Sequence, residues 1–253
     1  MCPGVNIFIG ENATGKTDLL KVAYAACDIT KTKISFAEKL VRVFLPYRHL
    51  LGRLVQRTGK STTAVVEISR ADATIRTSFT NDAKEPESAK TTGTQAGEYP
   101  RQGCTRGRVL LPQEQRGKLE FTLLAEGLRK VALLWLLIQN GTLVDGSVLF
   151  WDEPEANLNP GMLSTVAEIL LALQRMGVQV RIATHDYVLV KELDLRMKDG
   201  DRVCSHALYR DEGGTIRHAM APTLAEIAPN AIVDTFVDLY RRDAERALGQ
   251  ASR

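Results

Sequence analysis

The sequence of 253 residues has no apolar run of about 18 residues or more, the length that a membrane-spanning helix needs. Its first residues also lack the basic segment and apolar stretch of a secretory signal. Cysteine is scarce, and the four cysteines form neither a CxxC pair nor a zinc-binding spacing. They are Cys2, Cys27, Cys104 and Cys204. We therefore expect a cytoplasmic chain with reduced thiols and no membrane contact.

A large excess of charge of one sign is also missing. The net charge of +3 is too small to indicate a nucleic-acid binder by itself. Basic residues do gather in two stretches, which are Lys39, Arg42, Arg48, Arg53, Arg57 and Lys60, and Arg101, Arg106, Arg108, Arg116 and Lys118. Each stretch is either a solvated surface or a surface for DNA or an acidic protein, so a nucleic-acid partner stays open.

Apolar strands and helical patterns alternate along most of the chain. Continuous apolar segments, typical of buried parallel strands, lie at 5–9, 147–151 and 178–183. Helical spacing of apolar residues covers 17–27, 127–139, the segment after residue 159, 188–195 and the segment from 231, and further strands are expected near 203–209 and 215–220. The helix at 127–139 is apolar nearly all round, which predicts that it is buried. This order predicts an α/β sheet with helices on both faces.

Residues 29–107 interrupt the alternation. They contain an expected helix over about 36–55, which Pro46 should interrupt or kink, and expected strands at 63–69 and 73–80. Residues 81–107 are poor in apolar side chains and predict a mobile loop. We therefore expect a single domain over 1–253 with an inserted helix/β-hairpin subdomain at 29–107.

A phosphate-binding pattern directly follows the first expected strand. Eight residues fit G-x-x-x-x-G-K-[ST] at every fixed position, namely Gly10, Glu11, Asn12, Ala13, Thr14, Gly15, Lys16 and Thr17. In such a loop the backbone N–H groups point at the β-phosphate, and the next helix adds its positive end. Lys16 would reach the β- and γ-phosphates, and the Thr17 hydroxyl would bind Mg²⁺. The pattern predicts a P-loop NTPase fold with ATP and Mg²⁺ as cofactors.

Two acids end a later apolar strand. Residues 148–151 run directly into Asp152 and Glu153. A carboxylate at the end of a buried strand beside the P-loop strand can hold Mg²⁺, and the next side chain can orient or deprotonate the attacking water. We expect Asp152 to be the metal ligand and Glu153 to be the catalytic base.

Together these motifs resemble the ABC-type ATPases, and more narrowly the soluble RecF-like and OLD-like "AAA family" ATPases of bacteria. The segment Asp152–Glu155 is similar to that group's Walker B extension. The segment Ala156–Pro160 is similar to its D-loop, which contacts the partner subunit and places Asn159 near nucleotide. His185 follows a strand as the family's switch histidine does. The resemblance implies that His185 hydrogen-bonds the γ-phosphate or the attacking water.

The family also has a signature loop, usually Leu-Ser-Gly-Gly-Gln, that opens a helix. Leu124–Arg129 occupies this place, so the resemblance assigns Ala125, Glu126 and Gly127 to the nucleotide of a partner subunit. The family's serine is replaced by Ala125. A glutamine that senses Mg²⁺ is expected after an earlier strand, near 109–111, where the candidates are Gln113 and Gln115.

The resemblance implies an ATPase that works as a switch. Two copies, or this chain and a related one, would close around two ATP molecules and open after hydrolysis, signalling to an effector protein in DNA repair or anti-phage defence. Two other functions remain: the nucleotide-binding subunit of a transporter, and a scaffold that binds ATP without useful turnover. The Asp-Glu-Pro-Glu form and the altered signature argue against the transporter, while Glu153 and His185 argue against the scaffold.

Overall fold

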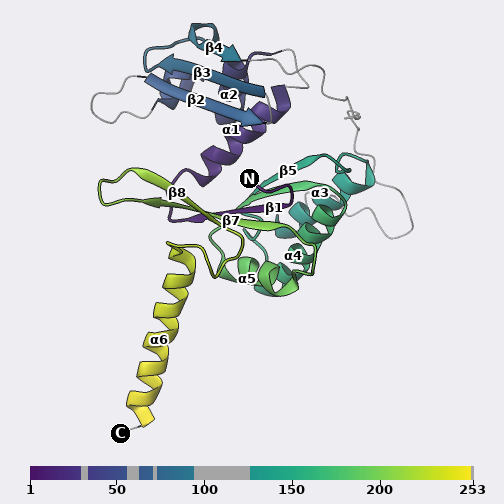
Figure 1. The fold of residues 1–253 in the computed structure, drawn as a ribbon, viewed down its shortest axis with the longest axis vertical. Helices are drawn as coiled ribbons and strands as arrows, with labels where there is room; N and C mark the ends of the chain where they lie inside the picture. The colour runs from purple at the N-terminus through teal and green to yellow at the C-terminus, as the bar shows by residue number, and fades with distance from the viewer. Residues whose placement is uncertain (30–33, 56–62, 71–72, 94–125, 252–253) are drawn as a thin grey trace. The chain divides into compact units, whose positions relative to one another are not determined.

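The computed structural model describes residues 1–29, 34–55, 63–70, 73–93 and 126–251, and it divides into two compact units (Figure 1). The first unit consists of residues 1–17 and 103–253, and the second of residues 18–102. The second unit begins earlier than the insertion that we expected from residue 29, and a single interrupted domain stays a prediction. No helix in the described ranges is long and apolar enough to cross a bilayer.

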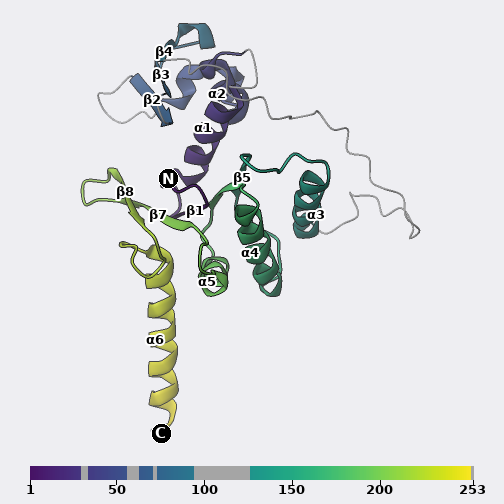
Figure 2. The ribbon, with the colours of Figure 1, turned by 45° about the vertical axis from the view of Figure 1, so that its right-hand side comes forward.

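A five-stranded sheet in the order β5-β6-β1-β7-β8 forms the centre of the first unit. The strands are β1 (Val5–Gly10), β5 (Val148–Asp152), β6 (Gln179–Ala183), β7 (Val203–Arg210) and β8 (Ile216–Ala221). The first four in spatial order are parallel, and β8 pairs antiparallel with β7. The helices are α3 (Glu126–Gln139), α4 (Pro160–Arg175), α5 (Tyr187–Arg196) and α6 (Ala231–Ala251), and Figure 2 shows α4 and α5 against the same side of the sheet. This helix-flanked parallel sheet confirms the predicted α/β class.

Alternate residues of the strands face the helices. Val5, Ile7 and Ile9 of β1 belong to one apolar cluster with residues of β6 and of helices α4 and α5. The residues between them, Asn6 and Phe8, are equally buried but contact β7 on the opposite face. Because side chains alternate across a strand, a continuous apolar run such as 5–9 indicates burial on both faces.

Helix α3 differs from the prediction of a helix buried all round. Gly127, Leu134 and Leu136 are buried, but Leu128 and Trp135 are between 40% and 50% exposed. Only the side of the helix that faces the core cluster is covered within the described residues. The apolar composition of the helix therefore overestimated its burial.

The register of the parallel strands brings their carboxyl ends to one edge of the sheet. Asp152 at the end of β5 pairs with Ala183 at the end of β6, and Ala183 pairs with Phe8 of β1. The segments that follow these strands are the P-loop, the acids from Asp152, and the segment that contains His185. All three sets of predicted site residues therefore leave the sheet at the same edge.

The second unit contains most of helix α1 (Lys16–Ile29) and an antiparallel sheet in the order β2-β3-β4. Its other elements are α2 (Phe36–Phe44), short 3-10 helices at Tyr47–His49, Leu51–Leu54 and Pro86–Ser88, and strands β2 (Thr63–Arg70), β3 (Ala73–Thr80) and β4 (Lys90–Gly93). A separate apolar cluster, which includes Phe36, Leu40 and Phe79, forms its core.

Two predictions for the second unit need correction in part. Helix α2 ends at Phe44, where Leu45 adopts a left-handed conformation (φ 48°) and Pro46 follows, so the expected interruption at Pro46 is confirmed, but only short 3-10 helices continue toward residue 55. Within the predicted loop 81–107, residues 90–93 form β4, which pairs with β3 through backbone groups despite its polar side chains. The rest of that loop from residue 94, the expected strand at 109–111, Gln113, Gln115 and Ala125 lie outside the described residues.

A chain of side-chain hydrogen bonds crosses the sheet between β1 and β8. The Asn6 amide nitrogen donates to the carbonyl oxygens of Cys2 (2.9 Å) and Gly4 (3.2 Å), so Asn6 Oδ1 is an acceptor and His206 Nε2 must donate to it (3.2 Å). Because Nε2 of His206 carries the hydrogen, its other ring nitrogen, Nδ1, accepts a hydrogen bond from His218 Nε2 at 3.0 Å. The His206 ring also stacks on Phe8, with ring centroids 4.7 Å apart.

This arrangement makes the stability of the first unit depend on pH. Burial, and then the facing His218, lower the pKa of His206 from 6.5 to about 4. The unfolded chain therefore takes up a proton at His206 before the folded chain does. The lowered pKa of His206 therefore stabilises the folded state above pH 6.5, and this contribution to the free energy of unfolding is lost as the pH falls toward 4. We expect the free energy of unfolding to drop by about 1–2 kcal/mol between pH 6.5 and 5 on this account.

Urea denaturation followed by tryptophan fluorescence tests this, because the chain's two tryptophans, Trp135 and Trp151, both belong to the first unit. The control is His206→Gln, which keeps an N–H donor for Asn6 but does not titrate. The loss between pH 6.5 and 5 should disappear in this variant. An equal loss in both proteins would assign the effect to other groups.

Candidate active site

The P-loop leaves β1 through a close backbone contact. A Cβ at Gly10 would lie 2.1 Å from the carbonyl oxygen of Leu208 on β7, so only glycine fits there. Ala13 adopts a left-handed conformation (φ 60°), which is unfavourable for a residue with a Cβ. The Thr14 hydroxyl donates to the carbonyl oxygen of Glu11 at 2.8 Å and closes the loop on itself. The loop thus has a defined, strained shape.

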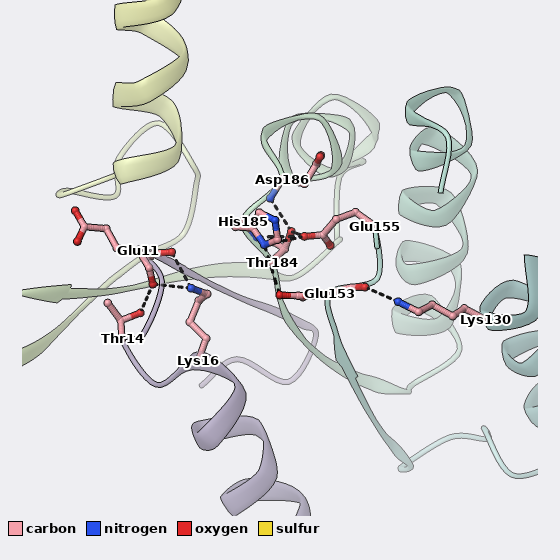
Figure 3. Close-up of polar contacts among 10 residues, drawn as sticks. Glu11, Thr14, Lys16, Lys130, Glu153, Glu155, Thr184, His185 and Asp186 are labelled. Carbon is pink, nitrogen blue, oxygen red and sulfur yellow. Dashed lines mark hydrogen bonds and ion pairs between the residues drawn. The ribbon is translucent and has the colours of Figure 1, made fainter. Parts of the chain in front are cut away.

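The Lys16 side chain lies across this loop (Figure 3). Its ammonium nitrogen donates to the carbonyl oxygens of Gly10 and Glu11, both at 2.8 Å. Burial lowers the pKa of Lys16, and the carboxylates of Asp152, Glu153 and Glu155 oppose that shift. The predicted phosphate-binding cation therefore lies within electrostatic reach of the predicted acids.

The predicted base, Glu153, begins the loop after β5 in a strained conformation. Its φ is +47°, in the left-handed region, and its backbone N–H donates to the carbonyl oxygen of Ala183 at 2.9 Å. From helix α3, the Lys130 ammonium donates to the Glu153 carbonyl oxygen at 3.1 Å. These two contacts fix the backbone of Glu153, while its side chain remains 53% exposed. Strain of this kind is often found at functional sites.

His185 faces two carboxylates. Its Nδ1 atom is 3.7 Å from Glu153 Oε1 and 3.6 Å from Glu155 Oε1. Figure 3 shows the three side chains turned toward one another. The imidazole is also exposed, at 56% of its surface, so a ligand can reach it. The structure thus brings the predicted base and the predicted switch histidine together.

Glu155 is a site residue that sequence reasoning missed. It is only 8% exposed, and its Oε1 atom accepts hydrogen bonds from the Thr184 hydroxyl (2.8 Å) and from the His185 backbone N–H (3.2 Å). The available signal was the second acid of the Asp-Glu-Pro-Glu segment, which directly follows the predicted base and a proline.

Arg210 at the end of β7 was also missed. Its guanidinium donates to the carbonyl oxygens of Ala13 in the P-loop (2.9 Å) and of Gly214 in the β7–β8 turn (3.1 Å). The arginine therefore ties the hairpin to the phosphate-binding loop. Contacts to backbone carbonyls leave no pattern in the sequence, so no signal could have found this one.

The signature and D-loop residues lie next to each other. A Cβ at Gly127, near the start of α3, would be 2.2 Å from the carbonyl oxygen of Asn157. Asn159 caps helix α4, because its Oδ1 atom accepts from the Gly161 N–H at 2.9 Å. Packing therefore explains Gly127, and capping explains Asn159, within one chain. The nucleotide contacts assigned to Glu126, Gly127 and Asn159 stay predictions.

The oxygen donors at this edge fit a nucleotide-bound Mg²⁺. No group of three or more histidine, cysteine, aspartate or glutamate side chains in the described segments could hold a metal ion by itself. Mg²⁺ at a phosphate site needs only one or two protein oxygens, because phosphate and water supply the rest. The Thr17 hydroxyl and the Asp152 carboxylate are donors of the right chemistry.

The acids at the end of β5 do not lie directly beside the P-loop strand as expected, because β6 lies between β5 and β1. A P-loop after β1, a histidine after β6 and acids at the end of β5 together define a P-loop ATPase of the ABC type. The chain belongs to the family described as "AAA domain, putative AbiEii toxin, Type IV TA system", which matches residues 34–191, more than half of its length. That match begins after the P-loop, and it includes the acids and His185.

Two solved structures resemble the fold at low sequence identity. The Smc head bound to the C-winged helix domain of ScpA is 9% identical, with a TM-score of 0.61 over 88% of this chain and 92% of that chain. The SMC head domain from Thermotoga maritima is 12% identical, with a TM-score of 0.45 over 88% of this chain and 91% of that chain. No curated protein matches the sequence. The similarity to the first structure shows a shared fold.

The contact at Gly127 gives a stability prediction. Gly127→Ala should destabilise the first unit by about 1–3 kcal/mol, because the new methyl group would overlap the Asn157 carbonyl and the Leu158 side chain. Gly161→Ala is the matched control, since its Cβ would meet nothing closer than 3.4 Å in the first turn of α4. Urea denaturation by tryptophan fluorescence measures both. Equal stability of the two variants would contradict the packing at Gly127.

Proposed function

We propose that this chain binds ATP with Mg²⁺ and hydrolyses it. One observation carries the proposal: the register of β1, β5 and β6 gathers the P-loop lysine, two acids and a histidine at one edge of the sheet. Membership of an AAA-domain family and the fold shared with an Smc head support it.

In the proposed reaction Lys16 leaves its loop carbonyls and contacts the β- and γ-phosphates, while the N–H groups of the P-loop hold the β-phosphate. Thr17 and Asp152 hold Mg²⁺, which neutralises charge on the phosphates. Glu153 orients the attacking water and accepts its proton. His185, beside Glu153, hydrogen-bonds the γ-phosphate or the same water. The exposed fractions of Glu153 and His185 leave both side chains reachable by substrate.

We further propose that hydrolysis drives a dimerisation switch. In the RecF-like and OLD-like group that the motifs resemble, the signature and D-loop segments of one subunit meet the nucleotide of the other. The packing of Gly127 on residues 157–158 supports this arrangement, because it places the signature segment beside the D-loop segment, so that both can face the same nucleotide of the partner. The partner is then a second copy or a related chain, and the signal passes to an effector. The family's description refers to a toxin–antitoxin system, which supports a role in anti-phage defence, while DNA repair stays the alternative.

Removal of the P-loop lysine should abolish tight nucleotide binding. Lys16→Ala takes away charge-assisted hydrogen bonds to two phosphates, so the dissociation constant for ATP·Mg²⁺ should rise by roughly 100-fold or more. Isothermal titration calorimetry measures this change. The control is Lys198→Ala, which replaces a lysine on the loop after α5 and should bind ATP·Mg²⁺ with the dissociation constant of the wild-type protein. Tight binding by Lys16→Ala would refute the assignment of the P-loop.

Neutralising the base should separate binding from turnover. Glu153→Gln keeps the size of the side chain but cannot accept the proton, so kcat should fall by roughly 100- to 10,000-fold while ATP affinity is retained. Released phosphate measures the turnover. Light scattering should show the mass of this variant rising with ATP and Mg²⁺ to about twice the 27.9 kDa of one chain.

The double variant Lys16→Ala/Glu153→Gln is the control and should stay at the mass of one chain. Normal turnover by Glu153→Gln would require another base. An unchanged mass in the presence of ATP would refute the homodimer, and a related chain would then be the remaining candidate for the partner.

A further inference from the structure

Glu155 holds a buried carboxylate that the proposed chemistry does not use. Its side chain is 7% exposed, and its buried Oε2 atom has no hydrogen-bond partner among the residues that the structure describes. Burial of a carboxylate is unfavourable unless its contacts compensate. All hydrogen bonds that the structure gives this carboxylate go to one segment, the residues that follow β6.

A single carboxylate oxygen organises three consecutive residues of that segment. Glu155 Oε1 accepts from the Thr184 hydroxyl and from the His185 N–H. The Thr184 oxygen in turn accepts from the Asp186 N–H at 3.0 Å, and Asp186 Oδ1 caps helix α5 by accepting from the Leu189 N–H at 2.7 Å. The position of His185 between β6 and α5 therefore depends on Glu155.

The same oxygen also acts on the His185 ring. It lies 3.6 Å from Nδ1, on the side of the ring that also faces Glu153 Oε1. An ionised carboxylate accepts hydrogen bonds and cannot donate them, so the ring nitrogen that faces both carboxylates is favoured as the one that carries the hydrogen. This leaves Nε2 as the ring nitrogen available to a ligand.

We propose that Glu155 is a positioning residue for hydrolysis, which fixes the His185 segment and turns the imidazole so that it meets the reacting groups beside Glu153. This inference rests on the proposed ATPase function. In this proposal Glu155 acts through His185 and not directly on the nucleotide or the attacking water. The alternative is an anchor that only stabilises the start of helix α5.

The predicted signature of a positioning role is a loss of turnover without a loss of binding. Glu155→Ala should lower kcat by about 100-fold, the effect of misplacing a reacting group by about 1 Å. The dissociation constant for ATP should change by less than about threefold, because the P-loop contacts are untouched. Glu155→Gln keeps an oxygen that can accept from Thr184 and His185, so it should retain turnover within about tenfold of the unchanged protein.

A double-mutant cycle distinguishes action through His185 from general stabilisation. If Glu155 acts through the histidine, Glu155→Ala should lower kcat by no more than about threefold in a His185→Ala background. Full additivity of the two losses, or a loss of kcat that follows the loss of thermal stability across both Glu155 variants, would overturn the positioning role. Should Glu155→Ala not fold, Glu155→Asp with His185→Ala completes the cycle, because the shorter side chain withdraws the carboxylate from Thr184 and His185, and the two losses should again be non-additive.

The failure of this inference is distinguishable from that of the proposed function. Turnover that depends on Glu153 but not on Glu155 overturns the positioning role alone. Absence of any Glu153-dependent turnover in the unchanged protein overturns both.

Discussion

The parallel hydrogen-bond ladder that joins β5, β6 and β1 is the constraint on which the rest of the site depends. It sets Asp152 opposite Ala183, and Ala183 opposite Phe8, so three loops leave the sheet at one edge. Backbone bonds extend the same ladder beyond the strands, from the Glu153 N–H to the Ala183 carbonyl and from the Thr184 N–H to the Phe8 carbonyl. A register shift of one residue would turn Asp152 to the opposite face of the sheet and separate the acids from Lys16.

Local strain at this edge is held by contacts from outside the loops. Ala13, Glu153 and Asn157 are non-glycine residues with φ between 47° and 64°, and each such conformation costs on the order of 1–2 kcal/mol. Arg210 holds the carbonyl of Ala13, Lys130 holds that of Glu153, and close packing against Gly127 holds that of Asn157. The strained residues therefore persist because helix α3 and the β7–β8 hairpin fix their carbonyl groups.

A feature of this fold was predictable where it depends on the identity of side chains, and was not predictable where it depends on contacts to backbone groups. The P-loop, the acids and His185 are predictable because short apolar runs mark the ends of strands, and parallel strands share an edge. Contacts of Lys130 and Arg210 to backbone carbonyls are not, since any residue offers a carbonyl. Strand β4 was not predicted for a similar reason, because its pairing with β3 uses backbone groups while its side chains are polar. The burial of α3 was overestimated because composition does not say which side of a helix is covered.

Lys16 shows how nucleotide binding would act on this framework. Its ammonium already uses two of its three N–H groups in hydrogen bonds of 2.8 Å to loop carbonyls, so phosphates can bind the third N–H group and compete with Gly10 and Glu11 for the other two. The exchange favours the phosphate, because its negative charge attracts the ammonium more strongly than a neutral carbonyl oxygen does. It also releases both carbonyl groups of a loop whose Ala13 carbonyl is bound to Arg210. Because those bonds share one short loop, the geometry of the P-loop and that of the β7–β8 hairpin cannot change independently.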